Sequence, residues 1–146
     1  MLSKTCEYAI RALIYIAQQT KEGYKVGIKE IAKGIDSPEY FIAKILQEMV
    51  RQNLLQSTKG PTGGFHLSEK DLNNSLAVIV RQFDGDKIFS GCALGLKQCS
   101  EKNPCPLHHQ FKEIRNTLKD LLETTTFTML VDRLESKEVF LKLNLE

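Results

Sequence analysis

Apolar residues near the N-terminus recur at the spacing of an amphipathic helix. They form one stripe from Cys6 to Ala17, which predicts a first helix of about four turns. Ser3 is placed to cap this helix, and the polar stretch that ends at Gly23 closes it. A second, shorter apolar stripe predicts another helix over residues 28–35. The chain is therefore expected to open with two helices joined by a short connection.

A third helix is predicted over residues 38–52. Its start signal is strong, because Ser37 can cap free backbone amides, Pro38 suits the first helical position and Glu39 favours the positive end of the helix dipole. Apolar residues form one face of this helix, and polar side chains recur at helical spacing on the other face. That outward face can donate hydrogen bonds and carry positive charge. Its members are Tyr40, Lys44, Gln47 and Arg51.

Two short β-prone runs follow, over residues 54–58 and 65–67. The six residues between them contain three glycines and one proline, a composition typical of a hairpin loop. A fourth helix is predicted over residues 75–83. Three helices followed by a glycine-rich hairpin is the order of a winged helix-turn-helix, whose recognition helix enters the major groove and whose hairpin touches the DNA backbone or minor groove.

Helical periodicity disappears over residues 91–106 and then returns. The next apolar residues recur at spacings of four and three, a pattern typical of a helix that packs lengthwise against another helix. Two heptads are too few for an independent coiled coil, so this helix either joins two copies of the chain or packs within one copy. A short helix over residues 127–134 and an apolar tail over 139–145 complete the pattern. The stripe consists of Leu107, Phe111, Ile114, Leu118 and Leu121.

Together these elements predict a mainly α fold with a small β-hairpin wing, that is, a winged helix-turn-helix followed by a long C-terminal dimerisation helix. We divide the chain into a DNA-binding domain over residues 1–83, a cysteine-rich loop over 84–106, and a dimerisation helix and tail over 107–146. The length of 146 residues fits one ordinary globular domain and excludes a multidomain machine.

The net charge of +2 is small, but it is unevenly distributed. Residues 1–68 carry nine lysines and arginines against six acidic residues, whereas residues 69–146 carry eleven against twelve. The predicted DNA-binding half is therefore the basic half. The N-terminus lacks the features of a secretory signal, and no apolar run is long enough to span a membrane. A cytoplasmic protein with reduced cysteines and no membrane partner is expected.

Several residues of this half have the chemistry of DNA contacts. Ser37 and the amides at the start of the third helix could hold a phosphate, while Lys44 and Arg51 could reach phosphates or guanine edges. Tyr40 and Gln47 could contact bases. Each residue taken singly could merely solvate a helix, but together with the order of elements they favour double-stranded DNA as a partner. The predicted DNA-binding residues, including those of the wing, are Ser37, Tyr40, Lys44, Gln47, Arg51, Lys59, Thr62 and Gly63.

Three cysteines fall in the aperiodic segment, at Cys92, Cys99 and Cys105, and His108 follows after two intervening residues. Soft thiolates suit an iron–sulfur centre or zinc, and the tight pair spacing common in structural zinc sites is missing. From spacing alone, both metals and unliganded thiols remain open. Cys6 lies on the apolar stripe of the first helix and is expected to be a buried core thiol.

Four segments form a specific combination: the run EYAIRALIYIA, the segment IDSPEYFIAKILQEMVRQNLLQS, the wing TKGPTGGFHLS and the late three-cysteine cluster. With them the chain resembles the Rrf2 family of bacterial transcription regulators over essentially its whole length. The resemblance implies a homodimer that binds a palindromic operator, with the helix after the cysteines as the dimer helix. It also implies an iron–sulfur cluster (2Fe-2S or 4Fe-4S) in the cysteine loop. In IscR-like members an arginine tends to precede the Gly-Pro of the wing; Lys59 keeps the charge but loses the bidentate fork.

The resemblance offers two candidates for the fourth cluster ligand. His108 lies where IscR-like members have a histidine ligand, and Glu7 lies where NsrR-like members carry an acidic ligand donated by the partner subunit. Cys6 is a third candidate by chemistry alone. The predicted cofactor-binding residues are therefore Cys92, Cys99, Cys105, His108 and Glu7, with the three cysteines as metal ligands.

The preferred hypothesis is a DNA-binding transcriptional regulator, more specifically a repressor, whose operator binding is modulated by an iron–sulfur cluster that senses nitric oxide, redox state or cluster supply. The main alternative is a winged-helix regulator that senses a small metabolite, with zinc or no metal at the cysteines. A cysteine-dependent redox enzyme is a remote alternative. The sequence has no C-x-x-C pair, nucleophile elbow, phosphate loop or cofactor fingerprint, so we expect no enzyme.

Overall fold

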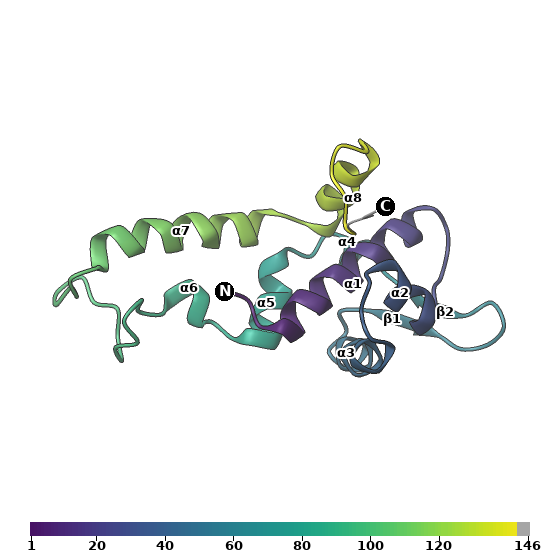
Figure 1. Ribbon diagram of the computed structural model, residues 1–146, viewed down its shortest axis with the longest axis horizontal. Helices are drawn as coiled ribbons and strands as arrows, with labels where there is room; N and C mark the ends of the chain where they lie inside the picture. The colour runs from purple at the N-terminus through teal and green to yellow at the C-terminus, as the bar shows by residue number, and fades with distance from the viewer. Residues whose placement is uncertain (143–146) are drawn as a thin grey trace.

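In the computed structural model, which describes residues 1–142, a helical body carries an arm that projects from one side (Figure 1). The elements in chain order are α1 (Lys4–Lys21), α2 (Ile28–Gly34), α3 (Glu39–Arg51), β1 (Gln56–Thr58), β2 (Gly64–His66), α4 (Glu69–Leu72), α5 (Leu76–Asp84), α6 (Lys87–Ser90), α7 (His108–Thr124) and α8 (Phe127–Glu135). The body contains α1 to α4, the two strands and α8. The arm contains α6, α7 and the cysteine loop between them, and α5 joins the two parts (Figure 1).

Helix α1 is the central element of the body. Ser3 caps it as the sequence predicts, since the Ser3 hydroxyl accepts a hydrogen bond from the backbone amide of Cys6 at 3.1 Å. The buried face of α1 packs against α2, α3, α5 and α8 and against strand β2. Arg11 donates a hydrogen bond from this helix to the backbone carbonyl of Ile35, just beyond α2. Helix α1 therefore holds the helix pair α2 and α3 against the rest of the body.

Helix α3 begins one residue later than the sequence predicts. Its first residue is Glu39, and Pro38 occupies the N-cap position with an extended ψ of 131°. The predicted cap by Ser37 is wrong, because no side chain caps this helix and the Ser37 hydroxyl oxygen is buried without a hydrogen-bond partner. Pro38 takes the non-helical cap position, so Ser37 is moved one residue away from the free amides. The apolar face is buried as predicted, through Ile42, Ile45, Leu46 and Met49.

Strands β1 and β2 form an antiparallel hairpin that is shorter than the two predicted runs. Its paired residues are Gln56 with His66, Ser57 with Phe65 and Thr58 with Gly64. The connection between α1 and α2 adds a β-bridge, in which the backbones of Val26 and Phe65 exchange hydrogen bonds of 3.0 and 2.7 Å. This bridge pins the base of the hairpin to the body. The tip between the strands projects away from the helices (Figure 1).

A second small core joins the body to the arm. Arg81 on α5 donates hydrogen bonds to Asp86 at 3.0 Å and to Glu123 at 2.8 Å, and its guanidinium carbon lies 4.2 Å from the ring centre of Phe89. One side chain thus links α5, the start of α6 and the end of α7. The sequence did not predict α4 or α6, because four residues are too few to show a period. The buried members of this core are Cys6, Ala77, Val80, Phe89 and Leu122.

Helix α7 carries the predicted stripe and turns one side of it outward. Leu107, Ile114 and Leu121, which are spaced by seven residues, are 43%, 65% and 53% exposed. Phe111 and Leu118 are half-buried, and Leu118 packs against the second core. Over residues 1–142 the chain therefore leaves one row of large apolar side chains uncovered along its arm.

Helix α8 returns to the body and packs against α1. Phe127 and Val131 are buried in the main core, and the Lys21 ammonium forms ion pairs with Asp132 at 2.7 Å and Glu135 at 3.1 Å. The described part of the predicted apolar tail, residues 139–142, follows this helix, while residues 143–145 lie outside the described residues. Among the helices of residues 1–142, none is long and apolar enough to cross a membrane.

Candidate DNA-binding surface and cysteine loop

The outward face of α3 carries the predicted polar residues on its surface. Tyr40, Lys44, Gln47 and Arg51 are all exposed. The Lys44 ammonium lies 4.6 Å from the centre of the Tyr40 ring, one helical turn earlier. Arg51 pairs with Glu48 at 2.6 Å, so it must leave this partner before it can contact DNA. The face thus presents one unpaired lysine, one amide and one aromatic hydroxyl at helical spacing.

Phe41 extends this surface in a way that sequence reasoning missed. It is 55% exposed, and Tyr40 beside it is 66% exposed. The Phe41 ring stacks on Tyr8 of α1, with ring centres 6.4 Å apart and an angle of 16°, and meets Tyr40 edge-on at 5.9 Å. The guanidinium carbon of Arg11 lies over the Tyr8 ring, 5.3 Å from its centre. The sequence pattern placed Phe41 neither on the buried face nor among the polar residues of the outward face, so it assigned this ring no role.

Ser37 is the one predicted DNA contact that the structure turns inward. Its hydroxyl oxygen is buried, and it has no hydrogen-bond partner among the described residues. A phosphate contact through this side chain therefore requires the Ser37 hydroxyl to rotate outward. The backbone around it reverses direction at Asp36, which has a positive φ of 56°.

The tip of the wing places Lys59 and Thr62 in solvent. Gly63 has a structural role there, because a Cβ at this position would overlap the carbonyl oxygen of Thr58. The Gly63 amide donates instead to the carbonyl of Gly60 at 3.0 Å, which closes the turn. The wing is thus a tight loop that carries one lysine at its tip, as the sequence indicates.

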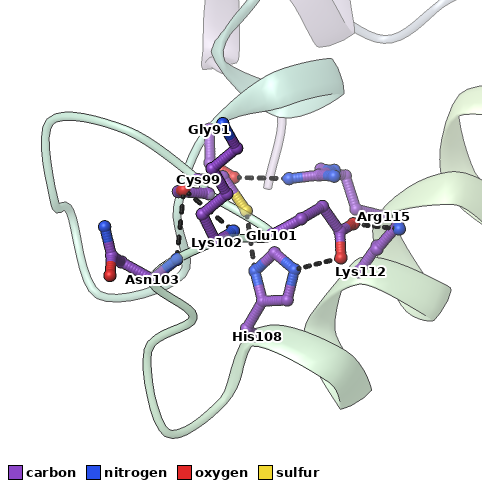
Figure 2. Close-up of polar contacts among 9 residues, drawn as sticks. Gly91, Cys99, Glu101, Lys102, Asn103, His108, Lys112 and Arg115 are labelled. Atoms are coloured by element: carbon purple, nitrogen blue, oxygen red, sulfur yellow. Dashed lines mark hydrogen bonds and ion pairs between the residues drawn. The ribbon is translucent and has the colours of Figure 1, made fainter.

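The cysteine loop brings Cys99 and His108 together at the start of α7. The sulfur of Cys99 lies 3.2 Å from Nδ1 of His108 (Figure 2). The His108 side chain is almost fully buried, and its Nε2 lies 3.4 Å from a carboxylate oxygen of Glu101 without forming a hydrogen bond. Glu101 also pairs with Lys112 of α7, and this contact lowers the pKa of Glu101 (Figure 2). One end of the loop is therefore tied to the arm around a buried imidazole.

The other two loop cysteines form a second pair. Backbone amides of Leu96 and Leu94 lower the pKa of Cys92, and a hydrogen bond with the thiol of Cys105 acts in the same direction. The start of the loop is held against α7 by Arg115, which donates a hydrogen bond to the backbone carbonyl of Gly91 at 3.2 Å (Figure 2). Cys99 thus contacts His108, while Cys105 acts on the pKa of Cys92.

These donors have the chemistry of a metal centre but are not gathered around one point. Within residues 1–142, no group of three or more histidine, cysteine or acidic side chains is arranged to hold a metal ion. Thiolates and an imidazole are the donors that iron–sulfur clusters and zinc take, and the buried Nε2 of His108 has no hydrogen-bond partner among residues 1–142. The donor set therefore fits such a group, provided that the loop draws its two pairs together.

The remaining two candidates lie outside this loop. Glu7 is half-buried in the first turn of α1. Cys6, beside it, is fully buried, and burial raises its pKa to about 12, with the charges of Asp84 and Glu7 acting in the same direction. A thiol that resists ionisation is a poor ligand, so Cys6 is the core residue that the sequence predicts.

Comparisons with known proteins agree over nearly the whole chain. A family model described as Rrf2, iron-dependent transcriptional regulator, matches residues 2–133. An HTH-type transcriptional regulator of Aquifex aeolicus is 33% identical over 142 residues, which are 96% of each chain. The HTH-type transcriptional regulator NsrR of Oceanobacillus iheyensis is 25% identical and covers 97% of this chain and 95% of its own.

Solved structures confirm the predicted fold. The global cysteine regulator CymR of B. subtilis matches with a TM-score of 0.72 at 22% identity, covering 91% of this chain and 97% of its own. IscR of T. potens matches with a TM-score of 0.73 at 18% identity, covering 95% and 91%. The winged-helix architecture is therefore shared with these regulators, and the relatives are transcriptional regulators rather than enzymes.

Proposed function

This chain belongs to the Rrf2 family of transcriptional regulators, and we propose that an iron–sulfur cluster in its cysteine loop controls how it binds an operator. The observation that carries the proposal is the contact between Cys99 and the buried imidazole of His108 at the start of α7. It joins a soft thiol ligand to the first turn of α7, at the outer end of the arm. Binding or loss of a cluster at this contact would therefore change how the loop packs against α7.

The ligands that we assign are Cys92, Cys99, Cys105 and His108. When bound, the cluster would supply a redox-active and nitric-oxide-reactive group, with reactivity set by its ligands and by solvent access. Support for His108 as the fourth ligand comes from its contact with Cys99 and from the burial of its imidazole beside the loop. Glu7 of a second copy is the alternative fourth ligand that the experiment below separates.

DNA recognition is assigned to α3 and the wing. Tyr40, Lys44 and Gln47 are exposed along α3, and Lys59 is exposed at the tip of the wing. In a winged helix-turn-helix these two elements meet the major groove and the flanking backbone or minor groove. The basic balance of residues 1–68 supports this placement, because phosphate neutralisation supplies much of the affinity for DNA.

A homodimer is the assembly that we propose. The uncovered row of Leu107, Ile114 and Leu121 on α7 has the spacing with which one helix packs against a second copy of itself. Beside it lies a hollow of about 660 Å³, whose lining includes Leu2 and Phe111. A two-fold dimer presents two α3 helices, so it would recognise a palindrome and act as a repressor where that site overlaps a promoter.

The test is anaerobic purification of the full chain, followed by iron and acid-labile sulfide counts and a visible spectrum. We expect iron, sulfide and a visible band in the wild type and none in the triple variant Cys92→Ala, Cys99→Ala, Cys105→Ala. Removal of the cluster should change the affinity for selected operator DNA by about 5- to 150-fold. Wild-type protein without iron, sulfide or a visible band would show that the proposal is wrong.

The fourth ligand is tested with two single variants and one matched control. His108→Ala should change the spectrum and weaken cluster retention, whereas His109→Ala should not, because His109 is an exposed neighbour on the same helix turn. A spectrum that changes in Glu7→Ala and not in His108→Ala would transfer the assignment to Glu7. Zinc in place of iron would instead favour the metabolite-sensing alternative.

A second candidate function is a regulator that responds to thiol chemistry without a cluster. The observation that favours it is the partly exposed thiol of Cys92, whose pKa is lowered by the backbone amides of Leu96 and Leu94 and by Cys105. The structural likeness to a protein titled as a global cysteine regulator points in the same direction. Iron-free protein whose DNA affinity changes on mild oxidation, with recovery on reduction, would support this candidate over the first.

A further inference from the structure

The first turn of α3 exposes two aromatic rings where the rest of the helix buries its apolar residues. Phe41 and Tyr40 are each more than half exposed, whereas Ile42 beside them is fully buried. Tyr40 has a hydroxyl that can meet water or a phosphate. Phe41 has no polar atom, and together with Tyr40 it makes an apolar surface at the start of α3 that is available to contact an apolar group.

The exposed ring of Phe41 is held in place by its neighbours. It stacks nearly parallel on Tyr8 of α1 and meets Tyr40 edge-on, and both arrangements are favourable for aromatic pairs. Arg11 lies over Tyr8 and Lys44 lies over Tyr40, so a cation flanks the aromatic cluster on each side. The ring is therefore presented to solvent among packed neighbours, and the exposed Lys44 nearby carries a positive charge that suits a phosphate backbone.

In the major groove, the C5-methyl group of thymine is the apolar feature that distinguishes one base pair from another. The N-terminal residues of a recognition helix are the ones that approach base edges. We propose that Phe41 contacts a thymine methyl group in each half-site of the operator and thereby selects thymine at that position. This inference rests on the proposed role of α3 as the recognition helix, and it assigns one base preference to one side chain.

The experiment begins with selection of binding sites from a random duplex library by the full-length, anaerobically purified protein. Each thymine of the enriched site is then replaced, one at a time, by deoxyuridine, which lacks only the methyl group. We expect one position per half-site at which the wild type binds about fourfold more weakly, and about sixteenfold when both half-sites are changed. Phe41→Ala should bind the thymine and deoxyuridine duplexes equally well.

The control variant is Phe140→Ala, which removes a phenylalanine of greater exposure from the C-terminal segment. It should keep the full discrimination between thymine and deoxyuridine. The deoxyuridine arm changes only the DNA, so it tests the wild type whether or not a Phe41 variant folds; circular dichroism checks the variants. Equal binding of every deoxyuridine duplex by the wild type would overturn this inference alone, whereas failure to enrich any sequence would overturn the proposed operator binding as well.

Discussion

Cys6 and the three loop cysteines differ in what surrounds the sulfur atom. Cys6 is fully buried in the second core, where burial raises its pKa to about 12. Cys92, Cys99 and Cys105 are partly exposed in an irregular loop, and backbone amides lower the pKa of Cys92. The thiolate is the form that binds metals and reacts, so the loop thiols can bind a metal or react, whereas the buried Cys6 thiol cannot readily do either.

We expect Cys6→Ala to keep the visible spectrum of the wild type and to lower stability by about 1 kcal/mol, because it removes one buried sulfur atom. Cys99→Ala is the matched loop variant and should lose the spectrum. Folding raises the pKa of Cys6 from 9.0 to about 12, because the folded core favours the neutral thiol. The stabilisation from this buried thiol is therefore complete at pH 7 and is lost as the pH rises between these two pKa values. Denaturant unfolding at pH 8 and pH 10 should therefore show the wild type losing stability relative to Cys6→Ala.

Labelling of the native protein with iodoacetamide, read by peptide mass spectrometry, checks the same assignment. The loop thiols of cluster-free protein should react well before Cys6. Labelling of Cys6 at the rate of the loop thiols, or loss of the spectrum in Cys6→Ala, would contradict it.

Gly63 is required by the turn of the wing, and its substitution tests whether the wing contributes to DNA affinity. A Cβ in Gly63→Ala would overlap the Thr58 carbonyl oxygen, so the turn must open. We expect a loss of roughly 1 to 3 kcal/mol in stability and weaker operator binding. Gly27→Ala is the control, because Gly27 lies outside the wing, has a negative φ of −89°, and its Cβ would meet only Glu30 Oε1 at an ordinary 3.8 Å. Fluorescence anisotropy with selected DNA should show a smaller loss for Gly27→Ala; equal affinities for both variants and the wild type would show that the wing makes no contribution.

Apolar periodicity located each helix of two turns or more, including the stripe on α7, because burial of one face imposes that period on the sequence. It could not locate α4 and α6, which are single turns. It also gave Phe41 no role, since the contact with Tyr8 of α1 depends on tertiary packing. The candidate site was likewise predicted only in part. Spacing identified the cysteines and His108, but which thiol contacts His108 is decided by the fold of an irregular loop.

Arg81 joins three elements, and its replacement tests that joint. Arg81→Lys keeps the charge but cannot reach Asp86 and Glu123 together with a planar fork, so we expect the melting temperature to fall by a few degrees at low salt. Arg51→Lys is the control, because Arg51 is exposed and forms one ion pair, with Glu48 one turn away. Differential scanning fluorimetry should show a larger decrease for Arg81→Lys, and the difference should shrink in high salt. Equal decreases for the two variants would mean that the joint adds nothing to an ordinary surface pair.

The whole molecule places the cysteine loop at the far end of the arm and α3 in the body (Figure 1). The two are connected through packed elements. Contacts run from the loop to α7, from α7 through Arg81 to α5, and from α5 to the start of α1, where the Ser3 amide donates to Asp84 at 2.8 Å. Helix α1 then carries Tyr8, which stacks on Phe41 of α3. A shift at the loop would act on the DNA-binding face through this series of contacts.

The effect of such a shift on an operator depends on the two copies being held together, and the exposed row of α7 tests this assembly. Ile114→Glu places a charge in the centre of the row, and burying it against a second copy without a partner is costly. We expect the dimer dissociation constant to rise by about 100-fold or more, measured by sedimentation velocity, and affinity for a palindrome to fall accordingly. Asn116→Glu adds the same charge on an exposed position of α7 outside the row and should remain dimeric. If Ile114→Glu has the sedimentation coefficient of the wild type, the row is not the dimer contact. The half-site spacing must then be set by another surface.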